Sequence, residues 1–261
     1  MGNDVRPPSQ PILVLGKLRR VMDAVAGDPA GLTSRQVQQA TGLPTSTTIR
    51  LLQNLAAEGF LDVDDGRYVV GLRVLRWAHT RRVDSRLAER AQPELNLLRD
   101  QTGETAVLFV RQGLQRVLVA LAETRHEVVR LVSLGQVMPL HAGSAGKVFL
   151  AFGEQARELA LAAPLPAWTP ATITDPARLR RHCAAIRDRG WAESVAERDS
   201  GTASISAPIY DHAGRLAAAI GIGVPQQRFT EDKRVRWAGA VAAAARRLSA
   251  GLGHDQNSTA G

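Results

Sequence analysis

The chain has 261 residues, of which 44% are hydrophobic and 22% are charged, and 33 Lys and Arg against 25 Asp and Glu give a net charge of +8. This composition excludes wholesale disorder, a collagen-like repeat and a disulfide-rich scaffold, and the length predicts one or two domains. The basic excess is compatible with a nucleic-acid partner but does not establish one.

The ends of the chain and its single cysteine bear on location. Cys183 cannot form an internal disulfide, and the N-terminus lacks the basic and apolar regions of a secretory signal. Apolar runs such as 238–245 are far shorter than the ~20 residues that cross a bilayer. We therefore expect a cytoplasmic protein with no membrane partner. Residues 1–11 are expected to form a disordered arm and residues 254–261 a disordered tail.

The first folded elements are three predicted helices. Apolar residues recur at helical spacing over 15–25 and predict the first helix. Thr33 and Gln36 have the spacing of a capping box, which predicts a two-turn second helix. Pro44 can occupy the first turn of a third helix, which ends near Gly59.

A hairpin and a linker follow these helices. An Asp-Gly pair at 65–66 lies between the apolar stretches 60–63 and 67–70, which is a strong hairpin signal. The order helix, helix, turn, helix, hairpin is that of a winged helix-turn-helix, which we assign to residues 12–72. Residues 73–90 are expected to form a linker helix.

The remaining residues, 91–253, are expected to form a second domain in which strands and helices mix, so the fold class is α+β. Strands are predicted at 106–111, 115–123, 128–132, 204–210 and 217–224, and helices at 146–152, 176–189 and 231–252.

The predicted helix-turn-helix carries a surface suited to DNA. No Asp or Glu occurs between Pro29 and Ala57, and acidic side chains there would repel phosphates. On the third helix Arg50 is the best candidate for a guanine or phosphate contact, and Ile49 could touch a thymine methyl group. The candidate DNA contacts are Ser34, Arg35, Thr45, Ser46, Thr47, Ile49, Arg50, Gln53 and Arg67. A polar helical face that only meets water is the alternative, and the fixed order of five elements argues against it.

Two sets of short motifs occur in order along the chain. The N-terminal set is Thr41-Gly42-Leu43-Pro44, Arg50-Leu51-Leu52-Gln53-Asn54-Leu55 and Glu58-Gly59-Phe60, and the C-terminal set is Thr102-Gly103-Glu104-Thr105, Pro139-Leu140-His141-Ala142, Ala145-Gly146-Lys147 and Arg187-Asp188-Arg189-Gly190-Trp191. With them, residues 12–253 resemble the IclR family of bacterial transcriptional regulators. Thr45, Thr48 and Ile49 depart from the family's usual residues, so the operator sequence cannot be borrowed from relatives.

The resemblance implies a winged helix-turn-helix joined by a linker helix to a GAF-like, mixed α/β effector-binding domain. It further implies a homodimer or dimer of dimers on a palindromic double-stranded DNA operator. We expect no enzymatic activity, cofactor or metal. Such a protein is expected to be a repressor whose operator affinity changes with a small organic-acid or amino-acid-related metabolite.

The resemblance also places an effector site on the loop after residue 142 and on two central strands. The residues implied are Leu140, Gly143, Ser144, Ala145, Ser194, Thr202, Ser204, Gly221 and Gly223. A carboxylate could accept hydrogen bonds from the N–H groups of Ser144 and Ala145 at a helix N-terminus and from the Ser204 hydroxyl. Gly221 and Gly223 replace serines of some relatives, which favours a larger or partly apolar acid. Close strand packing is an equal explanation for these glycines.

Two other functions are compatible with parts of this sequence. The segment around Ser144 is one residue away from a nucleophile elbow, so a Ser144-dependent hydrolase using His182 or His212 is an alternative. Gly146-Lys147 lacks the remaining residues of a phosphate loop, and the histidines lack metal-ligand spacing. A metabolite-binding module whose winged helix contacts protein is the second alternative.

Overall fold

The computed structural model describes residues 12–79, 82–126 and 132–254, and the chain divides into two compact units, 1–82 and 83–261. The predicted arm at 1–11 and almost all of the predicted tail lie outside the described residues. None of the described helices is long and apolar enough to cross a membrane.

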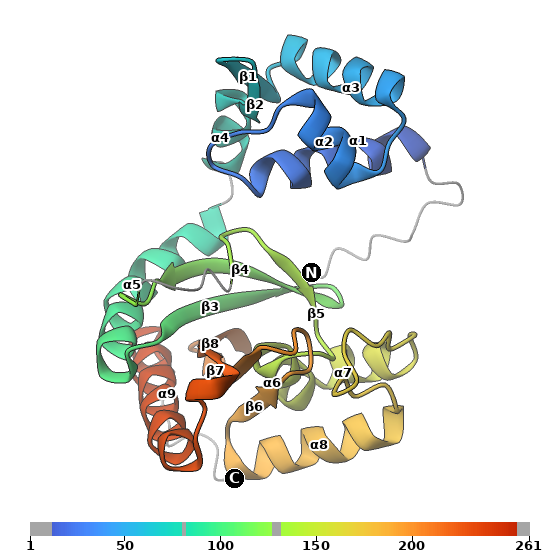
Figure 1. The fold of residues 1–261 in the computed structure, drawn as a ribbon. Helices are drawn as coiled ribbons and strands as arrows, with labels where there is room; N and C mark the ends of the chain where they lie inside the picture. The colour runs from blue at the N-terminus through green and yellow to red at the C-terminus, as the bar shows by residue number, and fades with distance from the viewer. Residues whose placement is uncertain (1–11, 80–81, 127–131, 255–261) are drawn as a thin grey trace. The chain divides into compact units, whose positions relative to one another are not determined.

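The first unit contains the helices and hairpin expected from the sequence (Figure 1). Its elements are α1 (Leu13–Ala26), α2 (Ser34–Thr41), α3 (Thr45–Ala57), β1 (Leu61–Asp64), β2 (Arg67–Val70) and α4 (Leu72–His79). Val21, Val37, Leu52 and Leu61 are fully buried where α1, α2, α3 and the hairpin meet. This small apolar core is what fixes α3 against the other two helices.

Local sequence explains the turns of this unit. Thr33 accepts a hydrogen bond from the N–H of Gln36, and the Gln36 side chain accepts one from the N–H of Thr33, as the capping box predicts. Asp65 and Gly66 both have positive φ, 45° and 71°, as a two-residue hairpin turn requires. Pro44 is the N-cap of α3 and lies one residue before the first turn in which we expected it.

The second unit is built on one antiparallel sheet of six strands in the order β5-β4-β3-β8-β7-β6. Its elements are α5 (Arg82–Thr102), β3 (Thr105–Gln112), β4 (Gln115–Ala122), β5 (Val137–Pro139), α6 (Ser144–Phe152), α7 (Glu154–Leu161), α8 (Pro176–Arg189), β6 (Ala192–Val195), β7 (Thr202–Tyr210), β8 (Leu216–Pro225), a 3-10 turn (Gln226–Arg228) and α9 (Glu231–Gly251). The α+β fold class is confirmed.

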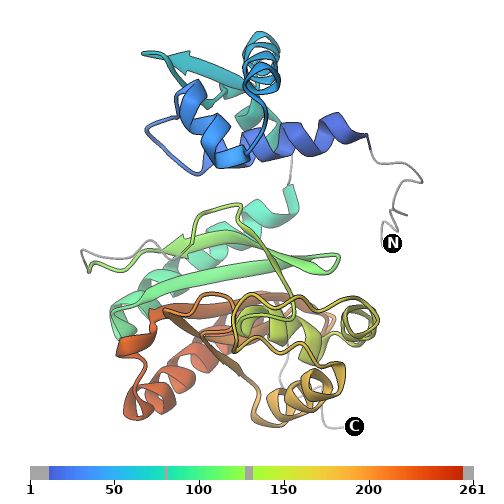
Figure 2. The same ribbon diagram turned by 45° about the vertical axis from the view of Figure 1, so that its right-hand side comes forward.

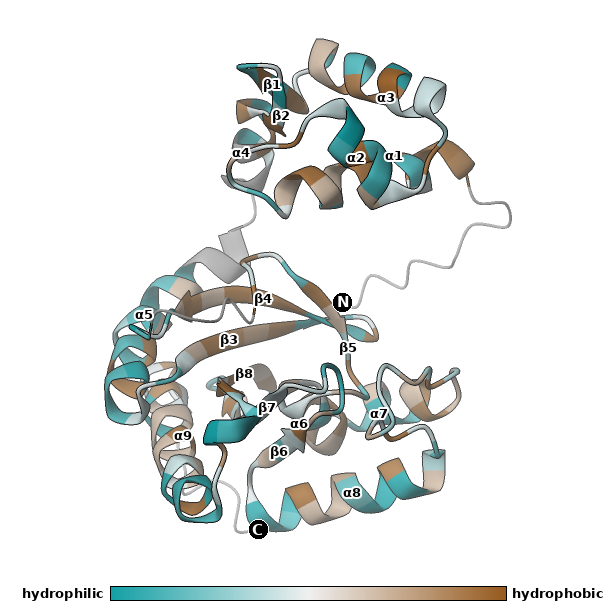
Figure 3. Ribbon diagram, in the orientation of Figure 1, coloured by the Kyte–Doolittle hydropathy of each residue, from teal (hydrophilic) through white to brown (hydrophobic). Residues whose placement is uncertain are grey.

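Helices cover both faces of this sheet (Figures 1 and 2). Helices α5 and α9 pack on one face around residues such as Leu108 and Ile220, whereas α6 and α8 pack on the other around Phe149 and Leu179. Strands β3 and β4 are therefore largely hydrophobic along their length, as Figure 3 shows. The effector site expected from the sequence falls on the α6 face.

The second unit departs from the sequence-based prediction in several elements. Strands β5 and β6 and helix α7 were not predicted. The predicted strand at 128–132 lies, apart from Val132, outside the described residues. The segment 73–90, expected to be a linker helix, falls on α4 and the first part of α5, with residues 80–81 outside the described residues.

Candidate DNA-binding surface and effector pocket

The exposed face of α3 carries most of the residues chosen from the sequence, and the others are Ser34 and Arg35 on α2 and Arg67 on β2. Thr48, Leu52 and Leu55 are buried, whereas Arg50 and Gln53 on the opposite face are exposed. The exposed members of the predicted set are Ser34, Arg35, Thr45, Ser46, Ile49, Arg50, Gln53 and Arg67, and Thr47 is half-buried. The face therefore presents hydroxyl, amide and guanidinium groups to solvent, as contacts with phosphates and base edges require.

Arg67 differs from the rest of this set. Its guanidinium donates a hydrogen bond to the Gly31 carbonyl at 3.1 Å, which ties the wing to the segment before α2. An isolated bridge between Leu32 and Tyr68 reinforces this contact. Arg67 thus has a structural partner within the unit besides its predicted role toward DNA.

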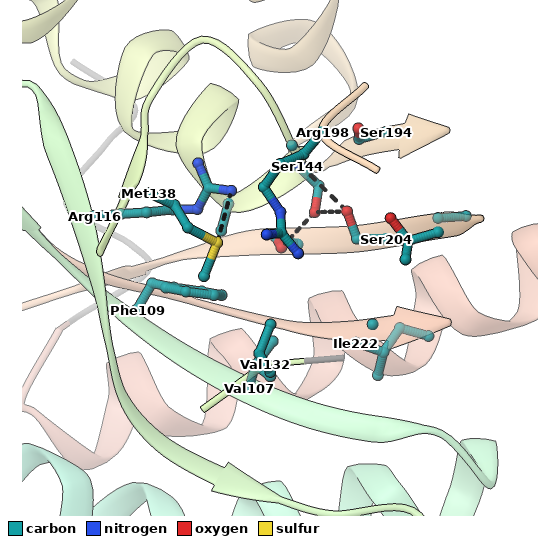
Figure 4. A pocket seen from close by; sticks show the side chains of 16 residues that line it. Val107, Phe109, Arg116, Val132, Met138, Ser144, Ser194, Arg198, Ser204 and Ile222 are labelled. Atoms are coloured by element: carbon teal, nitrogen blue, oxygen red, sulfur yellow. Dashed lines mark hydrogen bonds between the residues drawn. The ribbon is translucent and has the colours of Figure 1, made fainter. Parts of the chain in front are cut away.

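A small cavity opens between the sheet and the start of α6 (Figure 4). Its volume is about 60 Å³, measured as the space open to the centre of a water molecule. Its apolar wall is formed by Val107, Phe109, Val132, Met138, Ala203 and Ile222. The other wall is polar and is formed by Arg116, Gly143, Ser144, Ala145, Ser194, Arg198, Thr202, Ser204, Ser206 and Gly223.

Three serine hydroxyls meet at the polar wall. The Ser144 Oγ donates to the Ser204 Oγ and shares a hydrogen bond with the Ser206 Oγ, both at 2.8 Å. Ser204 and Ser206 point to the same side of β7 because they are two residues apart on one strand. Because the single Ser144 hydroxyl proton goes to Ser204, Ser206 donates to Ser144, and the Ser204 hydroxyl is left free to donate to an anion at the N-terminus of α6.

A buried ion pair shapes the loop before α6. Glu197 accepts a hydrogen bond from the Gly143 N–H at 3.1 Å and pairs with the fully buried ammonium of Lys147. Gly143 adopts a φ of 97°, which favours glycine. A Cβ at Gly143 would lie 2.6 Å from the Arg116 Nη2 atom, so the glycine also makes room for that guanidinium.

Two arginines contribute positive charge to the cavity. Burial lowers the pKa of Arg116 to about 9, with Arg198 lowering it further and Glu197 acting in the opposite direction. The pKa of Arg198 is also lowered, chiefly by burial, and is raised by Asp199. The Arg116 guanidinium remains charged at neutral pH because its lowered pKa is still above 7. No Asp or Glu is among the described residues that line the cavity.

The structure brings seven of the nine predicted effector residues to the cavity. Leu140 and Gly221 are not among its described lining residues. Leu140 packs in the core beneath α6. A Cβ at Gly221 would collide with the Ile205 carbonyl and the Ser206 Oγ, so this glycine permits close packing of β7 and β8 and opens no extra space. Sequence reasoning missed Arg116, Arg198, Ser206 and the apolar wall.

The serine environment does not resemble that of a hydrolase. The described hydrogen-bond partners of the Ser144 hydroxyl are Ser204 and Ser206. Of the two histidines considered as its base, His182 contacts the Lys147 Nζ at 3.1 Å, and His212 is exposed. A general base must reach the nucleophile's proton, and neither histidine is in hydrogen-bond contact with Ser144.

A helix-turn-helix unit with an acid-free exposed helix, followed by a unit with a small polar cavity, defines a ligand-responsive DNA-binding regulator. The chain belongs to the IclR family. Residues 80–250 match the family described as bacterial transcriptional regulator IclR C-terminal, and residues 14–65 match the IclR helix-turn-helix domain.

Individual relatives agree with this assignment. The HTH-type transcriptional regulator BhcR of Paracoccus denitrificans is 34% identical over 92% of this chain and 88% of that protein. The HTH-type transcriptional repressor AllR of Escherichia coli K12 is 34% identical over 81% of this chain and 79% of that protein. A crystal structure of an IclR homolog complexed with 4-hydroxybenzoate from Microbacterium hydrocarbonoxydans has a TM-score of 0.72 at 26% identity and covers 91% of this chain and 98% of that chain.

The family assignment identifies the chain as a transcriptional regulator that binds DNA and a small-molecule effector. It is not an enzyme, because the family consists of regulators, and the hydrolase hypothesis is thereby excluded.

Proposed function

We propose that the chain is a cytoplasmic repressor that binds a palindromic operator as a homodimer or dimer of dimers and loses or gains operator affinity when an organic acid occupies the cavity. In this proposal the winged helix-turn-helix at 12–72 binds DNA and the effector-binding domain at 91–253 binds the acid. The linker at 73–90 connects them. Relatives named as repressors, such as AllR, support the direction of regulation.

The acid-free exposed face of α3 is the observation that supports DNA readout most directly. Arg50 projects from the middle of this face and forms no ion pair with the described residues. Thr45 and Ser46 lie at the N-terminus of α3, where free N–H groups favour phosphate. Arg50 thus reads a base or a phosphate while the helix end fixes the register of the protein on DNA.

The polar wall of the cavity supports an organic acid as effector. The Ser204 hydroxyl, which Ser144 and Ser206 hold in place, and the N-terminus of α6 favour a carboxylate. An amino-acid ligand would bring its ammonium group toward Arg116 and Arg198, which would repel it. Since Gly221 opens no space and the cavity volume is about 60 Å³, the acid is small, in contrast to the larger ligand that the glycines favoured at first.

DNA readout is tested by replacing Arg50. The operator is first located by footprinting the full-length protein on the genomic DNA of its source, and the affinity of the Arg50→Ala variant for that operator is then measured by gel shift. We expect the substitution to weaken binding by ~1–3 kcal/mol, about 5- to 150-fold, and to relax one base position if Arg50 reads a base. Operator binding should also fall steeply with salt.

The matched control is Arg180→Ala, which removes an exposed arginine from α8 in the other unit. This variant should bind the operator as the wild type does. If both variants lost the same operator affinity, the loss would come from the change in net charge and not from a contact of Arg50. Unchanged binding by Arg50→Ala would contradict the proposed DNA-reading face of α3.

A further inference from the structure

We propose that the effector is a small dicarboxylate and that Arg116 and Arg198 bind its second carboxylate. This inference rests on the proposed function, since it names the ligand class of the same cavity. The first carboxylate is assigned to the serines and the N-terminus of α6, and the second to the two guanidinium groups.

Arg116 is a buried cation whose described partners carry no negative charge. It lies on β4, it is 3% exposed, and its Nε atom has no hydrogen-bond partner. One of its Nη atoms donates to the Pro139 carbonyl, the other contacts the Met138 sulfur at 3.6 Å, and its Cζ lies 5.3 Å from the Phe109 ring centre. Burial of a charge is costly unless a counter-charge pairs with it, so the geometry calls for an anion from outside the chain.

Arg198 approaches the same cavity from the opposite side. It belongs to the loop between β6 and β7, and Figure 4 shows its side chain extending past Ser144 into the space bounded by Phe109 and Val132. It is half-buried and forms no ion pair with the described residues. The two arginines repel each other across the cavity, and only an anion between them removes this repulsion.

Glu197 and Asp199 attract Arg116 and Arg198, respectively, but neither carboxylate forms an ion pair with an arginine of the cavity among the described residues. Glu197 is paired with Lys147 and accepts the Gly143 N–H. Asp199 is exposed and accepts the N–H of Gly201 at 3.0 Å. Two guanidinium charges therefore line the cavity without a carboxylate. One carboxylate would neutralise only one of them, whereas a dicarboxylate neutralises both.

The size and the apolar wall favour a short dicarboxylate over inorganic phosphate. A single water needs roughly 10–15 Å³ and a benzene-binding cavity about 150 Å³, so about 60 Å³ favours the shortest acids, and part of a four-carbon acid would lie in the open side of the cavity. Val107, Phe109 and Met138 offer contacts to methylene carbons, which phosphate lacks.

The experiment is calorimetric titration of the full-length protein with succinate and butyrate, and with malonate and propionate, at equal pH and ionic strength. Each pair has the same number of carbons and differs by one carboxylate. We expect the wild type to bind each dicarboxylate at least tenfold more tightly than its partner. Arg198→Gln and Arg116→Met should each reduce this preference, measured as the ratio of the two affinities within one variant, to less than about threefold.

The Arg180→Gln variant is the control, because it removes a comparable guanidinium from an exposed site on α8. If Arg116→Met fails to fold, as circular dichroism would reveal, the half-buried Arg198 still decides the question. Equal affinities for succinate and butyrate, or a preference that survives Arg198→Gln, would overturn the inference while leaving the acid-responsive regulator intact. Phosphate binding more tightly than both dicarboxylates would also overturn it. Failure of every acid to bind would overturn the organic-acid effector as well.

Discussion

Lys147 belongs to a Gly-Lys motif of the sequence, but in the structure it has a structural role. Its ammonium is fully buried, pairs with Glu197 and donates a hydrogen bond to the His182 Nε2 at 3.1 Å. Because an ammonium can only donate, His182 accepts through Nε2 and is neutral in this contact. The three side chains connect α6, α8 and the loop after β6, and the hydrogen bond from Gly143 to Glu197 links them to the loop that lines the cavity.

This network predicts a pH dependence of stability. Burial, followed by the charge of Lys147, lowers the pKa of His182 from 6.5 to about 4. Between these two values the unfolded chain binds a proton that the folded chain does not, so the free energy of unfolding falls as the pH falls from 7 to 4. The His182→Gln variant should lose this contribution, at most about 1.4 kcal/mol per pH unit, in urea unfolding curves recorded at pH 7, 6, 5 and 4.

The control for this experiment is His212→Gln, which replaces an exposed histidine in the turn between β7 and β8. Its unfolding free energy should follow the wild-type pH profile. A wild-type profile that does not change when His182 is replaced would show that other groups carry the acid sensitivity.

The candidate residues were predictable to unequal degrees. Ser144 and Ser204 could be chosen from the sequence because the family resemblance places an effector site on their loop and strand, and because hydroxyl groups can bind an anion. Arg116 was missed although its strand gives a signal, since it shares one face of β4 with the buried Leu118, where an apolar residue is normal. Arg198 gives no such signal, because a charged residue in a loop is normally exposed to solvent. Only the tertiary fold shows that the loop 196–201 places Arg198 against the cavity.

At the scale of elements, the contribution of the α2 capping box to the free energy of unfolding can be measured. The Thr33 hydroxyl accepts the Gln36 N–H and also donates to the Gln36 Oε1 at 2.9 Å. The Thr33→Ala variant leaves the first N–H groups of α2 without a side-chain acceptor, which costs ~1 kcal/mol, within a range of about 0.5–2. Chemical denaturation should show a lower midpoint for the first unit with an unchanged slope.

Ser34→Ala is the comparison, since this residue is next in sequence, is exposed, and its hydroxyl forms no hydrogen bond with the described residues. It should shift the midpoint far less than Thr33→Ala does. Equal shifts would mean that the capping geometry contributes no more than the helix propensity of the two positions.

The predicted elements are specified by residues close together in sequence, whereas the missed elements depend on contacts with distant parts of the chain. The α2 cap and the 65–66 turn are specified by residues in contact along the chain, so sequence pattern is enough. Strand β6, with only Ala192–Val195, is specified by its pairing with β7, and β5 is a three-residue edge strand. Neither is long enough to show a strand alternation, and each forms because a neighbour supplies its hydrogen bonds.

At the scale of the whole molecule, two separate apolar cores hold the two units. The core of residues 1–82 consists of a few side chains around Val37 and Leu52, whereas the core around Leu108 draws on two helices and four strands. Small domains bury a smaller fraction of their surface and are correspondingly marginal. The DNA-binding unit is therefore the one that a core substitution disables first.

Matched substitutions test this difference in the full-length chain. Leu52 and Leu108 are both 0% exposed, so Leu52→Ala and Leu108→Ala remove the same group from equally buried positions, at a cost of ~2–5 kcal/mol each. Scanning calorimetry of the wild type should show two transitions, one for each unit. Leu52→Ala should lower or abolish only the transition of the first unit, with loss of operator binding and retention of acid binding, and Leu108→Ala should lower only the other. A single transition displaced by both variants would show that the units unfold together, so that the winged helix draws its stability from the effector-binding unit and not from its own core.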